Sequence, residues 1–149
     1  MSIYFEDLEV GRVDTFGRCE VTREEVIAFA EKFDPQPFHL NDEAAAKTFF
    51  KRISASGWHI ASMTMSMLIK QVHAEGFQAA GSPGVEDLKF LKPVYPGDVL
   101  TCERTILEKR RSEKRPNMGV FREQICAYNQ DGVKVLSWQA SVFILVRGG

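Results

Sequence analysis

The sequence predicts an α+β fold in which one antiparallel β-sheet wraps around a single long central helix. Residues 53–69 contain no Lys, Arg, Asp or Glu, which is typical of a helix buried on most of its sides. In residues 133–146 an apolar residue recurs at every second position, which is the period of a strand; these residues are Leu136, Trp138, Ala140, Val142, Ile144 and Val146. The order along the chain is a strand, helices, one long apolar helix and then several strands, and this order favours an α+β class.

The first predicted strand leads directly into the first predicted helix. Residues 12–21 read as the strand, and Thr22 followed by Glu25 is typical of a capping box at a helix start. Apolar residues then recur at helical spacing. We expect this helix to end at Asp34, because Pro35 disfavours the helical conformation for the residue before it. The segment that follows is expected to be a stiff, extended loop.

Two further helices are predicted. The shorter begins near Asn41 or Asp42 and carries residues 44–50. The longer runs from residue 57 to about residue 75, before Gly76, which is suited to stop a helix. Because the longer helix is apolar all round, we expect it to bury most of its faces against a wide surface.

That surface is expected to be an antiparallel meander. Residues 129–132 (NQDG) favour a tight turn between the last two strands. The chain shows no linker, repeat or low-complexity tract, so residues 1–149 are expected to form one domain. The four further strands are predicted at residues 85–92, 99–108, 118–128 and 133–146.

Composition narrows the possible partners and the compartment. The 19 basic and 20 acidic residues leave a net charge of −1, so we expect neither nucleic acid nor a membrane as a partner. Cys19, Cys102 and Cys126 are odd in number and form no CxxC pair, which favours free thiols in a reducing compartment. The first residues lack the basic and apolar regions of a signal peptide. A cytoplasmic location is therefore expected.

Most catalytic templates are absent from the sequence. It contains no GxGxxG after a strand, no P-loop, no HExxH and no GxSxG. His39, His59 and His73 are not spaced with carboxylates or thiols in the manner of metal ligands. We therefore expect neither a metal site nor a bound cofactor.

An acid and a histidine remain as candidates for chemistry. Asp34 and His39 lie five residues apart on a segment stiffened by two prolines, so both side chains could converge on one water molecule. Histidine titrates near neutrality and can donate or accept a proton at working pH. The alternative is that Asp34 only ends the helix and His39 fills a hydrogen-bonded core position. The segment alone does not decide between the two.

The start of the long helix is a second candidate element. A helix N-terminus offers unpaired N–H groups and a partial positive charge, and Gly57 allows a ligand to approach closely. This arrangement suits an oxyanion that develops on a thioester carbonyl. Taken alone, the segment is more simply explained as a helix cap with a glycine that permits tight packing.

Three segments together resemble the MaoC-like dehydratases. They are residues 34–39 (DPQPFH), residues 55–57 (ASG) and residues 93–98 (PVYPGD). This family includes the (R)-specific enoyl-CoA hydratases and has the hot-dog fold, and the resemblance covers nearly the whole chain. Its first motif is usually Asp-x-Asn-Pro-x-His, whereas Gln36 replaces the Asn here.

The resemblance implies an acyl thioester hydratase or dehydratase. Asp34 and His39 would hold a water at C3 of a trans-2-enoyl thioester, with Asp34 as the general base and the pair returning a proton at C2. The backbone N–H of Gly57 would stabilise the enolate-like oxygen. The substrate would be carried by coenzyme A or an acyl-carrier protein. Since the family's members are typically dimers, a homodimer or a higher even oligomer is expected.

Further residues are candidates for substrate binding. The two aromatic side chains among them could line an acyl tunnel or belong to an ordinary core. The two arginines belong to a basic run that could meet the phosphates of coenzyme A, although such runs are more often solvated hairpin tips. The candidates are Gln36, Phe38, Ser56, Trp58, Arg110 and Arg111.

Two alternative functions are open at this point. A hot-dog acyl-CoA thioesterase usually needs a carboxylate on or beside the central helix, and residues 57–69 contain no Asp or Glu. A non-catalytic hot-dog subunit that binds an acyl thioester or a partner protein is encouraged only by the change at Gln36. Asp34, His39 and Gly57 all remain in place.

Overall fold

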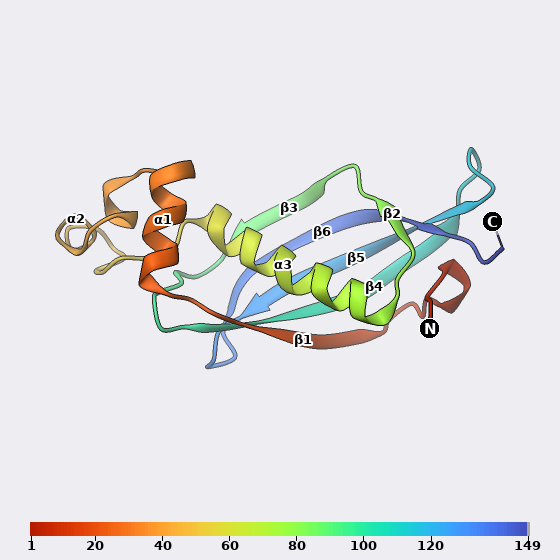
Figure 1. The fold of residues 1–149 in the computed structure, drawn as a ribbon, viewed down its shortest axis with the longest axis horizontal. Coiled ribbons are helices and arrows are strands. Elements are labelled where there is room, and N and C mark those ends of the chain that lie inside the picture. Colours follow the sequence, from red (N-terminus) through yellow and green to blue (C-terminus); the bar gives the residue numbers. More distant parts are fainter. Residues whose placement is uncertain (149) are drawn as a thin grey trace.

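The computed structural model describes residues 1–148 and shows a twisted antiparallel sheet with one long helix lying across it (Figure 1). The predicted α+β class is confirmed. In chain order the elements are η1 (Phe5–Asp7), β1 (Val13–Glu20), α1 (Arg23–Phe33), η2 (Pro37–His39), α2 (Asp42–Ala46), α3 (Gly57–Glu75), β2 (Ala79–Gly81), β3 (Val85–Phe90), β4 (Val99–Arg111), β5 (Met118–Tyr128) and β6 (Lys134–Leu145).

The sheet has six strands, of which β2 was not predicted from the sequence. Its order is β1-β4-β5-β6, and β2 and β3 both pair with the remaining edge of β6. All of these pairings are antiparallel, as expected for a meander. β2 is only three residues long and fully exposed, so it lacks the hydrophobic alternation by which a strand can be recognised.

Helix α3 has the predicted bounds because both of its ends are capped. The Ser56 hydroxyl accepts a hydrogen bond from the Trp58 N–H at 3.2 Å at the start. Gly76 ends the helix in the left-handed conformation with φ 73°, where a side chain would be strained and would also collide with the Met1 carbonyl. The two caps fix where α3 begins and ends.

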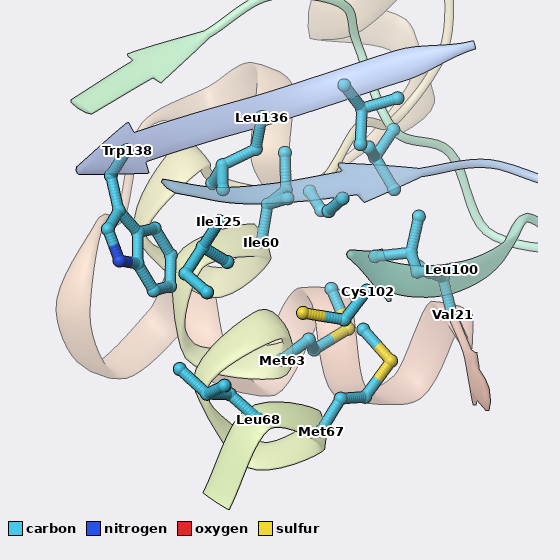
Figure 2. Close-up of a cluster of buried hydrophobic side chains, with 14 of the residues drawn as sticks. Val21, Ile60, Met63, Met67, Leu68, Leu100, Cys102, Ile125, Leu136 and Trp138 are labelled. Atoms are coloured by element: carbon cyan, nitrogen blue, oxygen red, sulfur yellow. The ribbon is translucent and has the colours of Figure 1, made fainter. Parts of the chain in front are cut away.

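The main core lies between one side of α3 and the inner face of the sheet (Figure 2). Alternation along the strands places every second side chain on this face. Figure 2 shows apolar side chains of α3 facing those of β4, β5 and β6. The labelled contributors from these elements are Ile60, Met63, Met67, Leu68, Leu100, Cys102, Ile125, Leu136 and Trp138.

The prediction that α3 is buried on most faces is wrong for the single chain. Trp58, Met65 and Ile69 are 59%, 39% and 40% exposed. The cause is that the sheet covers only one side of the helix, so the apolar residues of the other side have no cover within one chain. None of the helices in residues 1–148 is long and apolar enough to cross a membrane.

The segment between α1 and α3 departs from the prediction in two places. Pro37 starts the single 3₁₀ turn η2, so the loop is not extended throughout, and the Leu40 N–H donates to the Pro37 carbonyl. α2 begins after the N-cap Asn41 as predicted, but it ends at Ala46 rather than near residue 50. The hydroxyl of Thr48 donates to the Ala45 carbonyl, and such local bonds compete with continuation of a helix.

Candidate active site

Asp34 and His39 lie together at the N-terminal end of α3. Asp34 ends α1, and its N–H donates to the Ala30 carbonyl in the last helical turn. His39 ends η2, the 3₁₀ turn that starts at Pro37. The His39 Nε2 is 3.5 Å from Oδ2 of Asp34. The predicted convergence of the two side chains is therefore present in the structure.

A backbone carbonyl orients the His39 ring. His39 is buried, and its Nδ1 lies 2.7 Å from the carbonyl oxygen of Ser54. Because a carbonyl oxygen only accepts hydrogen bonds, Nδ1 carries a proton and donates it. In the neutral ring, Nε2 is then an acceptor that faces the Asp34 carboxylate. Two acceptors facing one point suit a molecule with two O–H donors, and water is the simplest such molecule.

Two side chains hold the Asp34 carboxylate. The Ser56 hydroxyl donates to Oδ2 at 2.7 Å, and the Gln36 amide donates to Oδ1 at 2.8 Å. Partial burial alone would raise the pKa of Asp34, but these hydrogen bonds and the nearby His39 together outweigh it, so its pKa lies below the usual value. Gln36 thus supplies a donor to the carboxylate from the position where the resembled motif carries Asn.

Gly57 starts α3 directly beside this pair. Its backbone N–H finds no acceptor within residues 1–148, as is usual in the first turn of a helix. A Cβ at this position would lie 2.4 Å from the ring of Phe90, so the close approach of that ring requires glycine. The packing explanation for Gly57 is therefore correct, and the free N–H is available in addition.

A cavity of about 460 Å³ joins these groups. Asp34, Gln36, His39 and Gly57 all line it. Aromatic contacts shape the walls, with the rings of Phe38 and Phe50 stacked at 5.3 Å and those of Trp58 and Phe90 edge to face at 5.8 Å. The volume lies within the range of small-molecule sites. The remaining lining residues are Phe49, Ala55, Ile60, Leu91, Lys92 and Pro93.

The structure does not bring the two predicted arginines to this cavity within one chain. Arg110 and Arg111 end β4 next to the turn into β5, which lies at the opposite end of the molecule from α1 and α2 (Figure 1). The guanidinium of Arg111 lies over the ring of Phe5 at 6.0 Å, and Arg110 lines a separate surface cavity near that turn. The physical reason is the length of β4, whose 13 residues carry the basic run away from the site.

The other candidate binding residues lie at the cavity or contact a residue that lines it. Phe38, Gln36 and Trp58 line the cavity, and Ser56, although buried, contacts Asp34 directly. His59 packs instead, since its ring stacks on Phe29 at 4.7 Å and burial lowers its pKa.

Several residues of the site were not found from the sequence. Phe50 and Phe90 form walls of the cavity, but aromatic residues outside a motif carry no signal that separates them from core residues. Lys92 also lines the cavity and directly precedes the motif at residues 93–98, which could have drawn attention to it. The carbonyl of Ser54 that orients His39 leaves no trace in the sequence, because every residue has a carbonyl. Within residues 1–148 no cluster of three His, Cys, Asp or Glu side chains could hold a metal ion.

Comparison with known proteins matches the chain to one protein family. A family described as "MaoC like domain" matches residues 9–125. An uncharacterized protein of Bacillus subtilis, YdeM, is 32% identical over 143 residues, covering 93% of this chain and 96% of that protein. The crystal structure of a MaoC-like dehydratase from Rhodospirillum rubrum is similar with a TM-score of 0.89 and 36% identity, covering 99% of this chain and all of that one. The structure of an (R)-hydratase from Aeromonas caviae is similar with a TM-score of 0.68 and 29% identity, covering 92% and 97% of the two chains.

Proposed function

The chain belongs to the MaoC-like domain family, whose hot-dog fold it shares, and we propose that it adds water to trans-2-enoyl thioesters or removes water from 3-hydroxyacyl thioesters. The family includes hydratases and dehydratases. One observation carries the proposal: the Asp34 carboxylate and the His39 Nε2 face each other at 3.5 Å, in a cavity that also contains the start of α3.

In the proposed reaction the pair binds one water, which lies beside the two acceptors and donates a hydrogen bond to each of them. The water oxygen attacks C3 of the enoyl group while Asp34 accepts one of its protons. The Asp34/His39 pair returns a proton to C2, so the overall change is the addition of one water. The hydrogen bonds from Ser56 and Gln36 keep Asp34 ionised before the reaction and fix its direction.

The thioester oxygen gains negative charge during this addition. The unpaired N–H of Gly57 and the positive end of the α3 dipole are the groups proposed to stabilise that charge. Both are preorganised by the capping hydrogen bond to Ser56, so they need little rearrangement during the reaction.

The aromatic walls support an acyl group as the occupant of the cavity, and the carrier is coenzyme A or an acyl-carrier protein. Lys92 is the cationic side chain among the described lining residues of the cavity, and it suits the phosphates of either carrier. We propose a cytoplasmic location, which is supported by the three free thiols of Cys19, Cys102 and Cys126.

We also propose that two copies of the chain form the working unit. The exposed side of α3 carries Trp58, Met65 and Ile69, and β3, which pairs with β6 on one side, carries exposed Val85 and Phe90. An apolar helix face beside a sheet edge with free backbone groups favours pairing with another chain. A second copy offers the same two features to match them.

The decisive experiment uses the purified full chain and trans-2-enoyl-CoAs of four to twelve carbons. Hydration is followed by the loss of the enoyl absorbance, and hydrolysis is followed by the release of free thiol. We expect hydration without thiol release. Thiol release at a comparable rate would identify a thioesterase instead, and tight binding without either signal would identify a non-catalytic subunit.

A further inference from the structure

The motif at residues 93–98 takes no part in the proposed reaction, although it forms a well-held turn. The carbonyl of Val94 accepts a hydrogen bond of 2.8 Å from the N–H of Ala55, in the segment directly before α3. The N–H of Tyr95 donates to Oδ2 of Asp98 at 2.9 Å, within the turn. The backbone of Tyr95 is thus fixed beside the segment that leads into the candidate active site.

The side chain of Tyr95 reaches from this turn to the loop at residues 47–52. Its hydroxyl donates a hydrogen bond of 2.8 Å to the carbonyl oxygen of Phe50, which lies 45 residues earlier in the sequence. The guanidinium of Arg52, on the same loop, lies over the Tyr95 ring at 3.9 Å. Tyr95 itself does not line the cavity of the candidate active site, so it can act on a bound substrate only through this loop.

The remaining hydrogen bonds of the loop are local. In the described part of the chain, the other hydrogen bonds that residues 47–52 make stay within residues 44–51. Lys51 has φ 70°, in the left-handed region that is unfavourable for a residue with a side chain. Such a conformation persists only where surrounding contacts hold it. The hydroxyl of Tyr95 supplies the hydrogen bond that joins this loop to the turn at residues 93–98.

Phe50 connects this anchor to the candidate active site. Its ring stacks on that of Phe38 with the centroids 5.3 Å apart, and it lies 6.3 Å from the ring of His39. The neighbouring ring of Phe49 contacts it at 4.1 Å and lines the same cavity. A shift of the Phe50 backbone would therefore displace an aromatic wall of the cavity.

The groups proposed for the chemistry are held independently of this loop. A backbone carbonyl orients the His39 ring. Gln36 and Ser56 hold the Asp34 carboxylate. None of these hydrogen bonds involves a residue of the loop at 47–52. Loss of the anchor should therefore weaken the binding of substrate and leave the proton transfers largely intact.

We propose that Tyr95 is a positioning residue of the candidate active site, whose hydroxyl holds Phe50 in the cavity wall and thereby strengthens the binding of the thioester substrate. The inference rests on the proposed function, from which the substrate is taken. The contribution is that of one hydrogen bond between uncharged groups, which corresponds to about a twofold to tenfold change in affinity.

The first test is the variant Tyr95→Phe, which removes only the hydroxyl and keeps the ring against Arg52. The KM for hydration of crotonyl-CoA is expected to rise about fivefold, while kcat stays within about twofold of the native value. Tyr128→Phe is the matched control, because it removes a hydroxyl that is also hydrogen-bonded but does not contact the cavity. An unchanged KM in Tyr95→Phe, or a fall in kcat at an unchanged KM, would overturn the inference.

A double variant shows whether Tyr95 acts through the ring of Phe50. Phe50→Ala removes that ring and should raise KM by itself. Tyr95→Phe should raise KM no further in this background, because the wall that the hydroxyl holds in place is already absent. Two increases in KM that multiply in the double variant would overturn the inference.

Limited digestion with trypsin tests the anchor without any turnover. Trypsin cleaves after Lys and Arg, and both Lys51 and Arg52 are exposed on the loop. Cleavage at these two positions requires local opening of the chain, so it should be about fivefold faster in Tyr95→Phe and unchanged in Tyr128→Phe. Equal cleavage rates in the native chain and in Tyr95→Phe would overturn the inference.

Calorimetric binding of butanoyl-CoA separates this inference from the proposed function, because a saturated thioester cannot be hydrated. Its Kd is expected to rise about fivefold in Tyr95→Phe and to stay unchanged in Tyr128→Phe. If these Kd values are found and the native chain does not hydrate crotonyl-CoA, the proposed reaction is refuted and the inference is supported. Equal Kd values for the native chain and Tyr95→Phe would overturn the inference, whatever the rate of hydration.

Discussion

The hydroxyl of Ser56 donates a hydrogen bond to Oδ2 of Asp34 at 2.7 Å, although 22 residues separate the two in sequence. The same carboxylate oxygen is the one that faces the His39 Nε2. Ser56 also caps α3, so one side chain ties the position of the proposed base to the helix start that carries Gly57. The end of α1 and the start of α3 are thereby held in one arrangement.

Replacing either member of the pair should abolish most of the activity. Asp34→Asn and His39→Ala are each expected to lower kcat for enoyl-CoA hydration by at least a hundredfold, since proton-transfer groups contribute ~10²–10⁴-fold. The fold should survive, as judged by circular dichroism. Asp131→Asn, in an exposed hairpin turn, is the matched control and should be fully active. Near-normal activity in both site variants would refute the assignment of the pair.

Removing the donors to Asp34 should shift the pH dependence of the reaction. Gln36→Leu and Ser56→Ala each remove a hydrogen bond that lowers the pKa of Asp34, so this pKa should rise. The base must be ionised, and activity is lost as the pH falls through its pKa. The acidic limb of kcat/KM should therefore move to higher pH in both variants. An unchanged limb with a uniformly lower rate would show that the two residues act only on structure.

Substitutions at Gly57 and Phe90 should have coupled effects on stability. Gly57→Ala places a Cβ 2.4 Å from the Phe90 ring, and displacement of the ring should cost about 1–3 kcal/mol of stability and reduce kcat/KM. In the double variant Gly57→Ala/Phe90→Ala the collision is absent, so much of the lost stability should return. Thermal unfolding of the two single variants and the double variant measures this coupling. Additive losses would contradict the observed contact.

The proposed dimer should depend on the exposed side of α3. Ser62 is exposed on this side between Trp58 and Met65, and it does not line the cavity of the candidate active site. Ser62→Arg is expected to place a charge against the second copy and to yield monomers in sedimentation velocity. Ser2→Arg, at another exposed serine, should leave the assembly unchanged. A Ser62→Arg protein that sediments as the native chain does would place the interface elsewhere.

Glu123 should make stability depend on pH near neutrality. Its pKa rises from 4.5 to about 7 on folding because of burial, so the folded chain holds a proton that the unfolded chain has lost in this range. Its contribution to stability is present below about pH 4.5 and is lost as the pH rises through about 7. The shift corresponds to on the order of 3 kcal/mol. Between pH 5 and pH 8, Glu123→Gln should therefore gain stability relative to the native chain in urea unfolding. If the free energy of unfolding changed with pH in the same way in Glu123→Gln and in the native chain, the raised pKa of Glu123 would be contradicted.

Local patterns in the sequence were sufficient for most of the fold. The caps at Thr22 and Gly76 act on their immediate neighbours, and the strands repeat every second residue, so both can be recognised without a partner segment. The motif at residues 34–39 also identified the pair Asp34 and His39, because its prolines restrict the chain locally. The end of α2 could not be predicted, because it depends on one side-chain bond of Thr48 that competes with the helix.

What the sequence determined by itself was the kind of fold, the bounds of α3 and the residues of the motif. Only the tertiary structure decided which groups meet: Ser56 with Asp34, the Ser54 carbonyl with His39, and the ring of Phe90 with Gly57. It also carried Arg110 and Arg111, at the end of β4, away from the site and buried the carboxyl-bearing side chain of Glu123 on β5. The physical reason is that these contacts join segments far apart in sequence, and their distances are set by how α3 packs on the sheet rather than by any local preference of the chain.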